Sequence, residues 1–191
     1  MSKLVTGRLR ASFVNLEEPN ALSGKYQLDL LIPKDSPEVK KIKSAINKAI
    51  EEGIQRTKKW NGKKPAKCFT PIKDGDEKIE EAEKPENYAA YEGMYYITPK
   101  ASKPSEFFIF DRDRNRIEPD EIYSGCYVRA SLEFFPYAHD LGGKGISVKL
   151  TALQFIADGE SLGGGRRSED DVAGDFDDDY EDFDDDEESA F

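Results

Sequence analysis

The chain has 191 residues and a formal net charge of −11, and this charge is concentrated at one end. Residues 166–191 contain two arginines and fourteen acidic side chains, a net charge of −12, which leaves 26 basic and 25 acidic side chains and a net charge of +1 in residues 1–165. The composition therefore excludes a uniformly acidic protein. It indicates one nearly neutral domain with an acidic appendage, a division typical of a connection with nucleic acid or of an interaction tail.

The sequence also excludes two cellular settings. It contains neither a run of about 18 apolar residues, as a membrane span requires, nor the apolar core of a secretory signal. Its two cysteines, Cys68 and Cys126, form no spaced cluster, and nothing requires a disulfide between them. We therefore expect a soluble protein of the cytoplasm.

Two stretches near the start of the chain alternate between apolar and polar residues, which is the pattern of a strand with one buried face. Residues 3–16 predict the first strand and residues 25–33 the second. The residues assigned to the buried face of the first strand are Val5, Leu9, Ala11 and Phe13. Between residues 37 and 52 apolar side chains recur at steps of three and four, which predicts an amphipathic helix with Ser36 as its N-cap.

The middle of the chain is less regular. Residues 55–90 show no apolar periodicity and predict a long surface excursion outside the core. Strand character returns at 91–102 and at 106–111. The final strands, 125–137 and the segment ISVKLTALQFI that follows AHDLGGKG, predict a hairpin with a glycine-rich tip. In the second of these, Ile146, Val148, Leu150 and Ala152 are assigned to the buried face.

The predicted fold class follows from the sum of these elements. Five or six short strands and one clear helix indicate an all-β fold with one or two helices, that is, a β-rich α+β fold. One helix between early strands and a long final hairpin favour a five-stranded barrel of the oligonucleotide-binding type (OB-fold) with insertions.

The outer face of GCYVRASLEFFPY, residues 125–137, combines three aromatic rings with an arginine. Large rings in water gain nothing unless something covers them, and a base stacked on such a ring gains about 1–3 kcal/mol. The alternative is that a helix or loop of the same chain covers the rings. The basic segment KKWNGKKPAK around Trp60 has two similar alternatives. It is either a loop that binds nucleic acid or a loop that is only solvated. The predicted DNA-binding residues are Arg8, Arg10, Trp60, Lys63, Tyr96, Lys100, Tyr127, Arg129, Phe135, Tyr137 and Lys149.

Motifs for catalysis are mostly missing from the sequence. The single histidine, His139, cannot form a zinc cluster or a catalytic triad by itself. The GGKG at residues 142–145 follows a strand but opens no helix, so it does not match a phosphate-binding loop. Asp111 and Asp113 resemble a metal-binding pair, although alternating arginines would neutralise them. We therefore expect no enzyme, no cofactor and no metal.

The chain ends in DFDDDYEDFDDDEESAF, and aromatic residues interrupt its carboxylates. Carboxylates can mimic phosphates and rings can mimic bases, so we predict that this tail competes with nucleic acid for the same groove and recruits other proteins when it is displaced. The terminal Phe191 can enter an apolar pocket of a partner while its α-carboxylate pairs with a cation. The predicted partner-binding residues are Phe183, Asp186 and Phe191. The alternative is a tail that only maintains solubility.

The tail that ends in phenylalanine, together with VTGRLRASFVNLEEP, KYQLDLLIPK and YYITPKAS, resembles bacteriophage single-stranded DNA-binding proteins, in particular those of the phage T7 type. This resemblance implies an OB-fold that coats single-stranded DNA with little sequence preference in replication, recombination and repair, inside the host cell cytoplasm. It also implies that the tail contacts the phage DNA polymerase and helicase-primase, and that the protein can form a homodimer. No groove motif of the family is sharp enough to transfer to individual residues.

The sequence therefore predicts an OB-fold nucleic-acid-binding domain over residues 1–158, a flexible linker over 159–168 and a disordered acidic tail over 169–191. Two other functions stay open. One is a DNA-mimic or adaptor protein whose acidic tail binds basic proteins and which ignores DNA. The other is a metal-dependent nuclease that uses Asp111 and Asp113.

Overall fold

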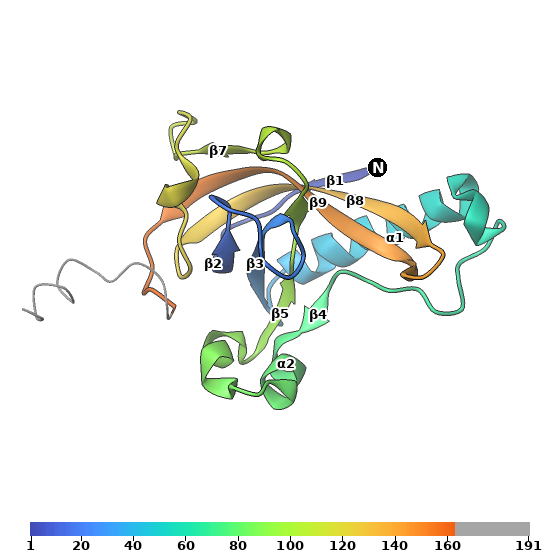
Figure 1. Ribbon diagram of the computed structural model, residues 1–191, viewed down its shortest axis with the longest axis horizontal. Helices are drawn as coiled ribbons and strands as arrows, with labels where there is room; N and C mark the ends of the chain where they lie inside the picture. The colour runs from blue at the N-terminus through green and yellow to red at the C-terminus, as the bar shows by residue number, and fades with distance from the viewer. Residues whose placement is uncertain (163–191) are drawn as a thin grey trace, which may run out of the picture.

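The two longest strands form a hairpin around which the rest of the sheet is arranged. A computed structural model describes residues 1–162. In it β8 (Tyr127–His139) and β9 (Gly143–Ala157) pair antiparallel along their whole length (Figure 1). The turn between them falls in the glycine-rich segment, so the predicted hairpin is confirmed.

Five strands pair in a closed circuit. β8 pairs with β2 (Leu9–Asn15), β2 with β3 (Tyr26–Pro33), β3 with β6 (Lys100–Ala101), and β6 with β9, which returns to β8. The β6–β9 pairing is parallel and the other four are antiparallel. This ring, together with the helices below, confirms the predicted β-rich fold class.

Shorter elements extend the ring. β1 (Ser2–Val5) pairs with β8, β7 (Phe108–Phe110) with β9, β5 (Met94–Ile97) with β3, and β4 (Lys73–Asp74) with β5. Two α-helices, α1 (Glu38–Arg56) and α2 (Gly75–Glu81), and four short 3₁₀ helices complete the described residues. The 3₁₀ helices are η1 (Lys58–Trp60), η2 (Pro85–Tyr91), η3 (Pro104–Glu106) and η4 (Pro119–Glu121).

Helix α1 packs its apolar stripe against the sheet, mainly against β8 (Figure 1). Val39, Ile42 and Ile46 are buried in the main core, which confirms the amphipathic helix predicted for residues 37–52. The prediction of Ser36 as the N-cap is wrong by one residue, since Pro37 occupies that position, although the Ser36 hydroxyl accepts a hydrogen bond from the backbone N–H of Glu38 at 3.2 Å. The helix continues beyond Gly53 to Arg56. The Trp60 ring lies so close to Gly53 that a Cβ there would be 2.5 Å from Cζ3 of the ring, so only glycine fits at this position.

The strand predicted for residues 3–16 is divided into β1 and β2. The break is held by the Glu38 carboxylate, which accepts a hydrogen bond from the Gly7 N–H at 2.9 Å. Phe13 has a φ of +43° within an irregularity of β2, so its side chain leaves the buried face. The expectation that Val5 and Phe13 are buried is wrong, since they are 56% and 43% exposed.

A second irregularity changes the predicted face of β9. Ile146, Val148 and Leu150 are buried as expected, but Leu153 takes the inward position that the alternation gave to Ala152. The β8–β9 register shifts between Ser131 and Leu132, which leaves Thr151 outside the ladder. Such a bulge inserts one residue into the pairing and reverses the alternation beyond it.

Residues 55–90 are mostly exposed or half-buried, as the predicted surface excursion requires, but Trp60 departs from the prediction and enters the core. Trp60 is 2% exposed and belongs to the main core, and its indole N–H donates to the Tyr137 carbonyl at 3.2 Å. The helix η2 starts in this segment and ends just after it at Tyr91, which is buried and whose hydroxyl donates to the Asp29 carboxylate at 2.5 Å. This segment is built from short helices and a two-residue strand, whose few buried residues leave no periodic pattern in the sequence.

The predicted tail, residues 169–191, and most of the predicted linker lie outside the described residues, so their boundaries stay predictions. Among residues 1–162, no helix combines the length and the apolar character that crossing a membrane requires.

We expect Trp60→Ala to lower the free energy of unfolding by about 3–5 kcal/mol, because it leaves a cavity between the core and Gly53. Urea denaturation of the free protein measures this loss. Lys63→Ala, at an exposed position three residues away, should change the stability by less than about 0.5 kcal/mol. An unchanged urea midpoint for Trp60→Ala would contradict the core position of the ring.

Candidate nucleic-acid interface

A cleft of about 800 Å³ opens beside the tip half of the β8–β9 hairpin. Its walls come from β6, from the ends of β8 and β9, and from the segment that leads into β4. We call it the lysine cleft, after the cations that line it. They are Lys25, Lys73, Lys100 and Lys149. The aromatic side chains that line it are Phe69, Phe135, Tyr137 and His139.

Strand alternation explains why three of these rings lie together. Phe135, Tyr137 and His139 occupy every second position of β8, on the face opposite the buried Phe134. The rings of Tyr137 and His139 have centroids 5.3 Å apart and are tilted by 33°. The cleft wall is therefore a row of rings along one strand.

The cations reach the cleft from neighbouring strands. Lys149 of β9 pairs with Lys100 of β6 in the parallel ladder, so these two lysines lie side by side. The Lys25 ammonium, which comes from the loop before β3, donates to the Ser102 hydroxyl at 2.6 Å.

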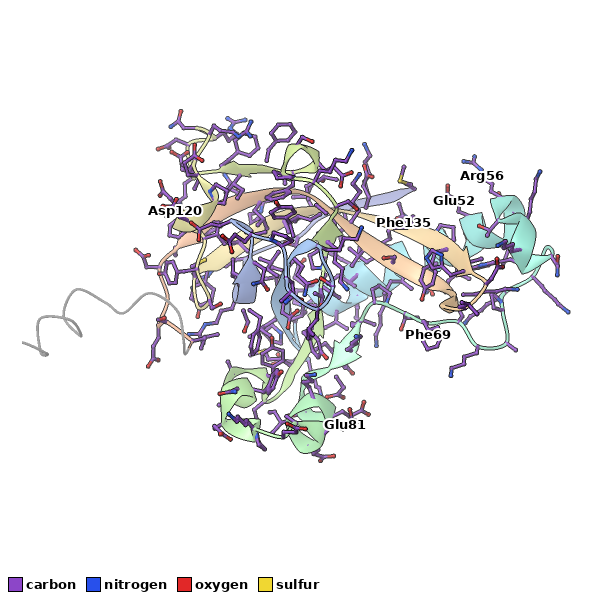
Figure 2. All side chains as sticks on the ribbon, in the orientation of Figure 1. Glu52, Arg56, Phe69, Glu81, Asp120 and Phe135 are labelled. Carbon is purple, nitrogen blue, oxygen red and sulfur yellow. The ribbon has the colours of Figure 1, made fainter. Side chains whose placement is uncertain are left out.

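The fourth ring, Phe69, comes from a segment that lies against the hairpin tip (Figure 2). Its N–H donates to the Lys144 carbonyl at 3.0 Å, and its carbonyl accepts from the Ile146 N–H at 2.8 Å. Gly145 allows this approach, because a Cβ there would collide with the Phe69 backbone. Phe69 keeps 44% of its surface exposed at the mouth of the cleft.

The cleft is electropositive. Four lysines and one acidic residue, Glu106, line it, which gives a net charge of +3. The Glu106 carboxylate accepts a hydrogen bond from the Ser102 N–H at 2.8 Å and lies 4.0 Å from the Lys149 ammonium. The backbone hydrogen bond is the main reason that the pKa of Glu106 lies below its usual value, so this residue stays ionised and offsets only part of the lysine charge.

The structure brings four of the predicted site residues together in the lysine cleft. These are Lys100, Phe135, Tyr137 and Lys149. Two other predictions are wrong, because Trp60 and Tyr96 are 2% and 7% exposed and offer no free ring face. Tyr96 packs against Leu31 and Tyr91 in a second small core cluster.

The remaining predicted residues lie elsewhere. Arg8, Arg10, Tyr127 and Arg129 gather at the far end of β8, where Arg10 pairs with Tyr127 across the β2–β8 ladder. Lys63 is exposed in the turn after η1 and does not line the cleft. The outer face of β8 is therefore divided into two regions.

Sequence reasoning missed four residues of the cleft. Lys25, Phe69 and Lys73 lie in loops or at strand ends without periodic neighbours, and His139 was set aside as a lone histidine. A usable signal was present in GGKG, because glycines within a strand often mark a place where another backbone approaches closely.

The Asp111 carboxylate makes its hydrogen bonds within its own loop. The Asp111 carboxylate accepts hydrogen bonds from the backbone N–H groups of Asp113 and Asn115 at 2.9 and 2.8 Å. These bonds, with Asn115 as the main cause, lower the pKa of Asp111 and close a turn. Within residues 1–162, no group of three or more His, Cys, Asp or Glu side chains is placed to hold a metal ion.

Comparison with known proteins gives one family match and several similar structures. The family described as "Enterobacter phage Enc34, ssDNA-binding protein" matches residues 2–186. The "Putative protein p50" of Acyrthosiphon pisum secondary endosymbiont phage 1 is 33% identical over 179 residues, which cover 85% of this chain and 88% of that protein.

Two similar structures are of the single-stranded DNA-binding protein from bacteriophage Enc34. Its C-terminal truncation is 26% identical with a TM-score of 0.65, over 84% of this chain and 88% of that one. Its complex with ssDNA is 27% identical with a TM-score of 0.63, over 85% of this chain and 90% of that one. The structure of gp2.5, a single-stranded DNA-binding protein of bacteriophage T7, is 16% identical with a TM-score of 0.61, over 93% of this chain and 96% of that one. At this low identity, the similarity supports the fold alone.

We expect Gly145→Val to detach the Phe69 segment from the hairpin, because the new side chain would occupy the space of the Phe69 backbone. Cys68 is half-buried and Cys126 fully buried, so detachment should raise the rate at which one thiol reacts with an aromatic disulfide reagent at fixed pH. Leu141→Ala, at the exposed tip of the same hairpin, is the matched control. Equal thiol reactivity in both variants would show that Gly145 is not needed for the attachment.

Proposed function

The chain belongs to the family of Enterobacter phage Enc34 ssDNA-binding proteins, and from this premise we propose that it binds single-stranded DNA in the lysine cleft without strong sequence preference. The observation that carries the proposal is the convergence of four lysines and four aromatic side chains in one open cleft. The Enc34 relative, whose structure has been solved with ssDNA, supports the choice of ligand.

The composition of the cleft suits a flexible strand. Each base has a π face that can stack on Phe69, Phe135 or Tyr137 whatever its identity. A lysine ammonium is a compact charge on a long stem, and it can follow a phosphate backbone that has no fixed geometry. OB-folds bind oligonucleotides through a strand face and two loops that include the hairpin between their last two strands. The lysine cleft borders the corresponding hairpin, β8–β9.

The cellular role that we propose is to coat single strands during phage DNA replication, recombination and repair in the host cytoplasm. In this proposal the acidic tail recruits the phage DNA polymerase and helicase-primase, with Phe183, Asp186 and Phe191 as its contact residues, and the protein can act as a homodimer. The tail, with its excess of carboxylates, also competes with DNA for the lysine cleft. The family resemblance and the charge division of the chain support these points.

Removing a cleft ring should weaken binding to an oligo-dT strand. Phe69→Ala, Phe135→Ala and Tyr137→Ala should each cost about 1–3 kcal/mol, or about 5-fold to 150-fold in Kd, because each removes one stacking surface. Fluorescence anisotropy with a labelled oligonucleotide measures the loss.

Phe13→Ala is a matched control for Phe69→Ala, since the two rings are 43% and 44% exposed and Phe13 lies outside the cleft. It should bind oligo-dT as the wild type does. If Phe13→Ala weakens binding as much as Phe69→Ala, or if none of the cleft variants weakens it, the cleft is not the DNA site.

The salt dependence of binding counts the phosphate contacts. Because each neutralised phosphate on a single strand contributes about −0.7 to the slope of log K against log salt concentration, Lys100→Gln and Lys149→Gln should each make the slope less steep by about 0.7. Lys40→Gln on the exposed face of α1 is the control and should leave the slope unchanged. Slopes that are identical in all four proteins would exclude both cleft lysines from phosphate contact.

A further inference from the structure

Six of the seven arginines in residues 1–162 gather at the end of the sheet away from the lysine cleft. We call this surface the arginine face. It consists of Arg8, Arg10, Arg112, Arg114, Arg116 and Arg129. The one arginine outside it is Arg56, at the end of α1.

The strand pairings show that the arginine face is continuous. Arg129 of β8 lies opposite Gln154 of β9, and Gln154 lies beside Phe110 of β7. The Gln154 side-chain amide donates to the carbonyls of Asp111 and Arg112 at 3.2 and 3.3 Å, which ties the loop of three arginines to this row.

Two of the guanidinium groups lie over aromatic rings, one half-buried and one exposed. The Arg8 guanidinium carbon lies 4.1 Å from the centroid of the Tyr127 ring, and that of Arg116 lies 4.6 Å from the centroid of the Phe108 ring. At these distances a cation is attracted to a ring face. One face of each of these two rings is therefore covered by an arginine.

The arginines of this face have no ion-pair partner within residues 1–162, although Asp111 and Asp113 alternate with three of them in the loop. No carboxylate of residues 1–162 lies within 4.0 Å of any of the six guanidinium groups, whereas Arg56 has such a partner in Glu52. The nearby Asp158 carboxylate instead accepts a hydrogen bond from the Tyr123 hydroxyl at 2.6 Å.

The described chain ends at this same surface. The Arg10 guanidinium donates to the Glu160 carbonyl at 2.7 Å, and the Leu162 N–H donates to the Ser124 carbonyl at 3.0 Å. Figure 1 shows the last described part of the chain, in orange-red, on the side away from the β8–β9 tip. Figure 2 shows Asp120 at that side, while Phe69 and Phe135 lie toward the other. Six residues separate Leu162 from Glu169, so the acidic segment begins within about 25 Å of Leu162.

We propose that the arginine face is the docking site of the acidic segment of the same chain, residues 169–191. Guanidinium groups bind carboxylates with two parallel hydrogen bonds, a geometry that a lysine cannot offer. The short tether gives the segment an effective concentration in the millimolar range at the face where it starts. Residues 169–191 contain fourteen acidic side chains that can bind this face.

This docking regulates the proposed DNA site. The acidic segment binds either the nearby arginine face or the more distant lysine cleft. Each molecule whose segment is bound to the arginine face has a lysine cleft that is free for DNA. Loss of the arginines should then weaken DNA binding, although in this proposal they contact no DNA. The DNA part of the inference rests on the proposed function, and the docking itself does not.

A double-mutant cycle in the full-length chain tests the regulation. The face variant carries Arg112→Gln, Arg114→Asn and Arg116→Gln; asparagine tolerates the φ of +66° at residue 114. The tail variant carries Asn in place of Asp177, Asp178, Asp179, Asp184, Asp185 and Asp186. We expect the face variant to bind oligo-dT at least about threefold more weakly than the wild type at low salt, and the same substitutions to have no effect in the tail variant.

Two results would overturn the proposal. An equal loss of affinity in both tail backgrounds would mean that the arginines contact DNA directly. No loss in either background would mean that they do not hold the tail away from the cleft. Lys40→Gln with Lys48→Gln, on the exposed face of α1, is the control for a general loss of positive charge, and it should have no tail-dependent effect.

Nuclear magnetic resonance without DNA tests the docking independently of DNA binding. Comparison of the wild-type chain with the tail variant at low salt should show chemical-shift changes at the backbone amides of residues 8–10, 112–116 and 129. Changes confined to the lysine cleft, or no changes in the domain, would contradict docking on the arginine face. A positive result here, combined with no binding of oligo-dT in the anisotropy assay, would refute the proposed function and leave the docking intact.

Discussion

The antiparallel pairing of β8 and β9 is the interaction on which both the core and the lysine cleft depend. Val128, Leu132 and Phe134 are fully buried on the inner face of β8. The side-chain period of a strand is two, so this burial forces Phe135 and Tyr137 outward, and a slip of one residue would exchange the two sets. The energy that buries the core therefore also fixes the orientation of the rings that line the cleft.

Packing between distant segments completes the cleft. The Trp60 ring packs against Gly53, and its indole N–H donates a hydrogen bond to the Tyr137 carbonyl of β8. The segment that follows Trp60 then pairs with the hairpin tip through the backbone of Phe69, which places the Phe69 ring at the cleft. The aromatic residues of the chain thus have separate tasks. Some fill the core and fix the loops, and others remain at the surface of the lysine cleft, where a ligand can cover them.

The two kinds of cation are also separated. Lysines line the cleft at the tip half of the hairpin, and arginines without carboxylate partners in residues 1–162 gather at its other end, where the described chain finishes. A lysine suits a flexible phosphate chain, and an arginine suits the planar carboxylate. In our proposal, one domain offers one site to nucleic acid and another to its own acidic segment, and the balance between them sets the affinity for DNA.

The sequence by itself determined the β-rich fold, helix α1, the final hairpin and four cleft residues, because regular alternation and helical spacing are local properties that need no knowledge of distant contacts. The acidic end and the family resemblance could also be read from the order of residues. Only the tertiary structure decided that Trp60 and Tyr96 are buried, that Phe13 and Leu153 depart from the alternation, and that Phe69 reaches the cleft while Arg129 does not. The physical reason is that bulges, single turns and close backbone approaches through glycine depend on contacts between segments far apart in the chain, and these contacts leave no period in the sequence.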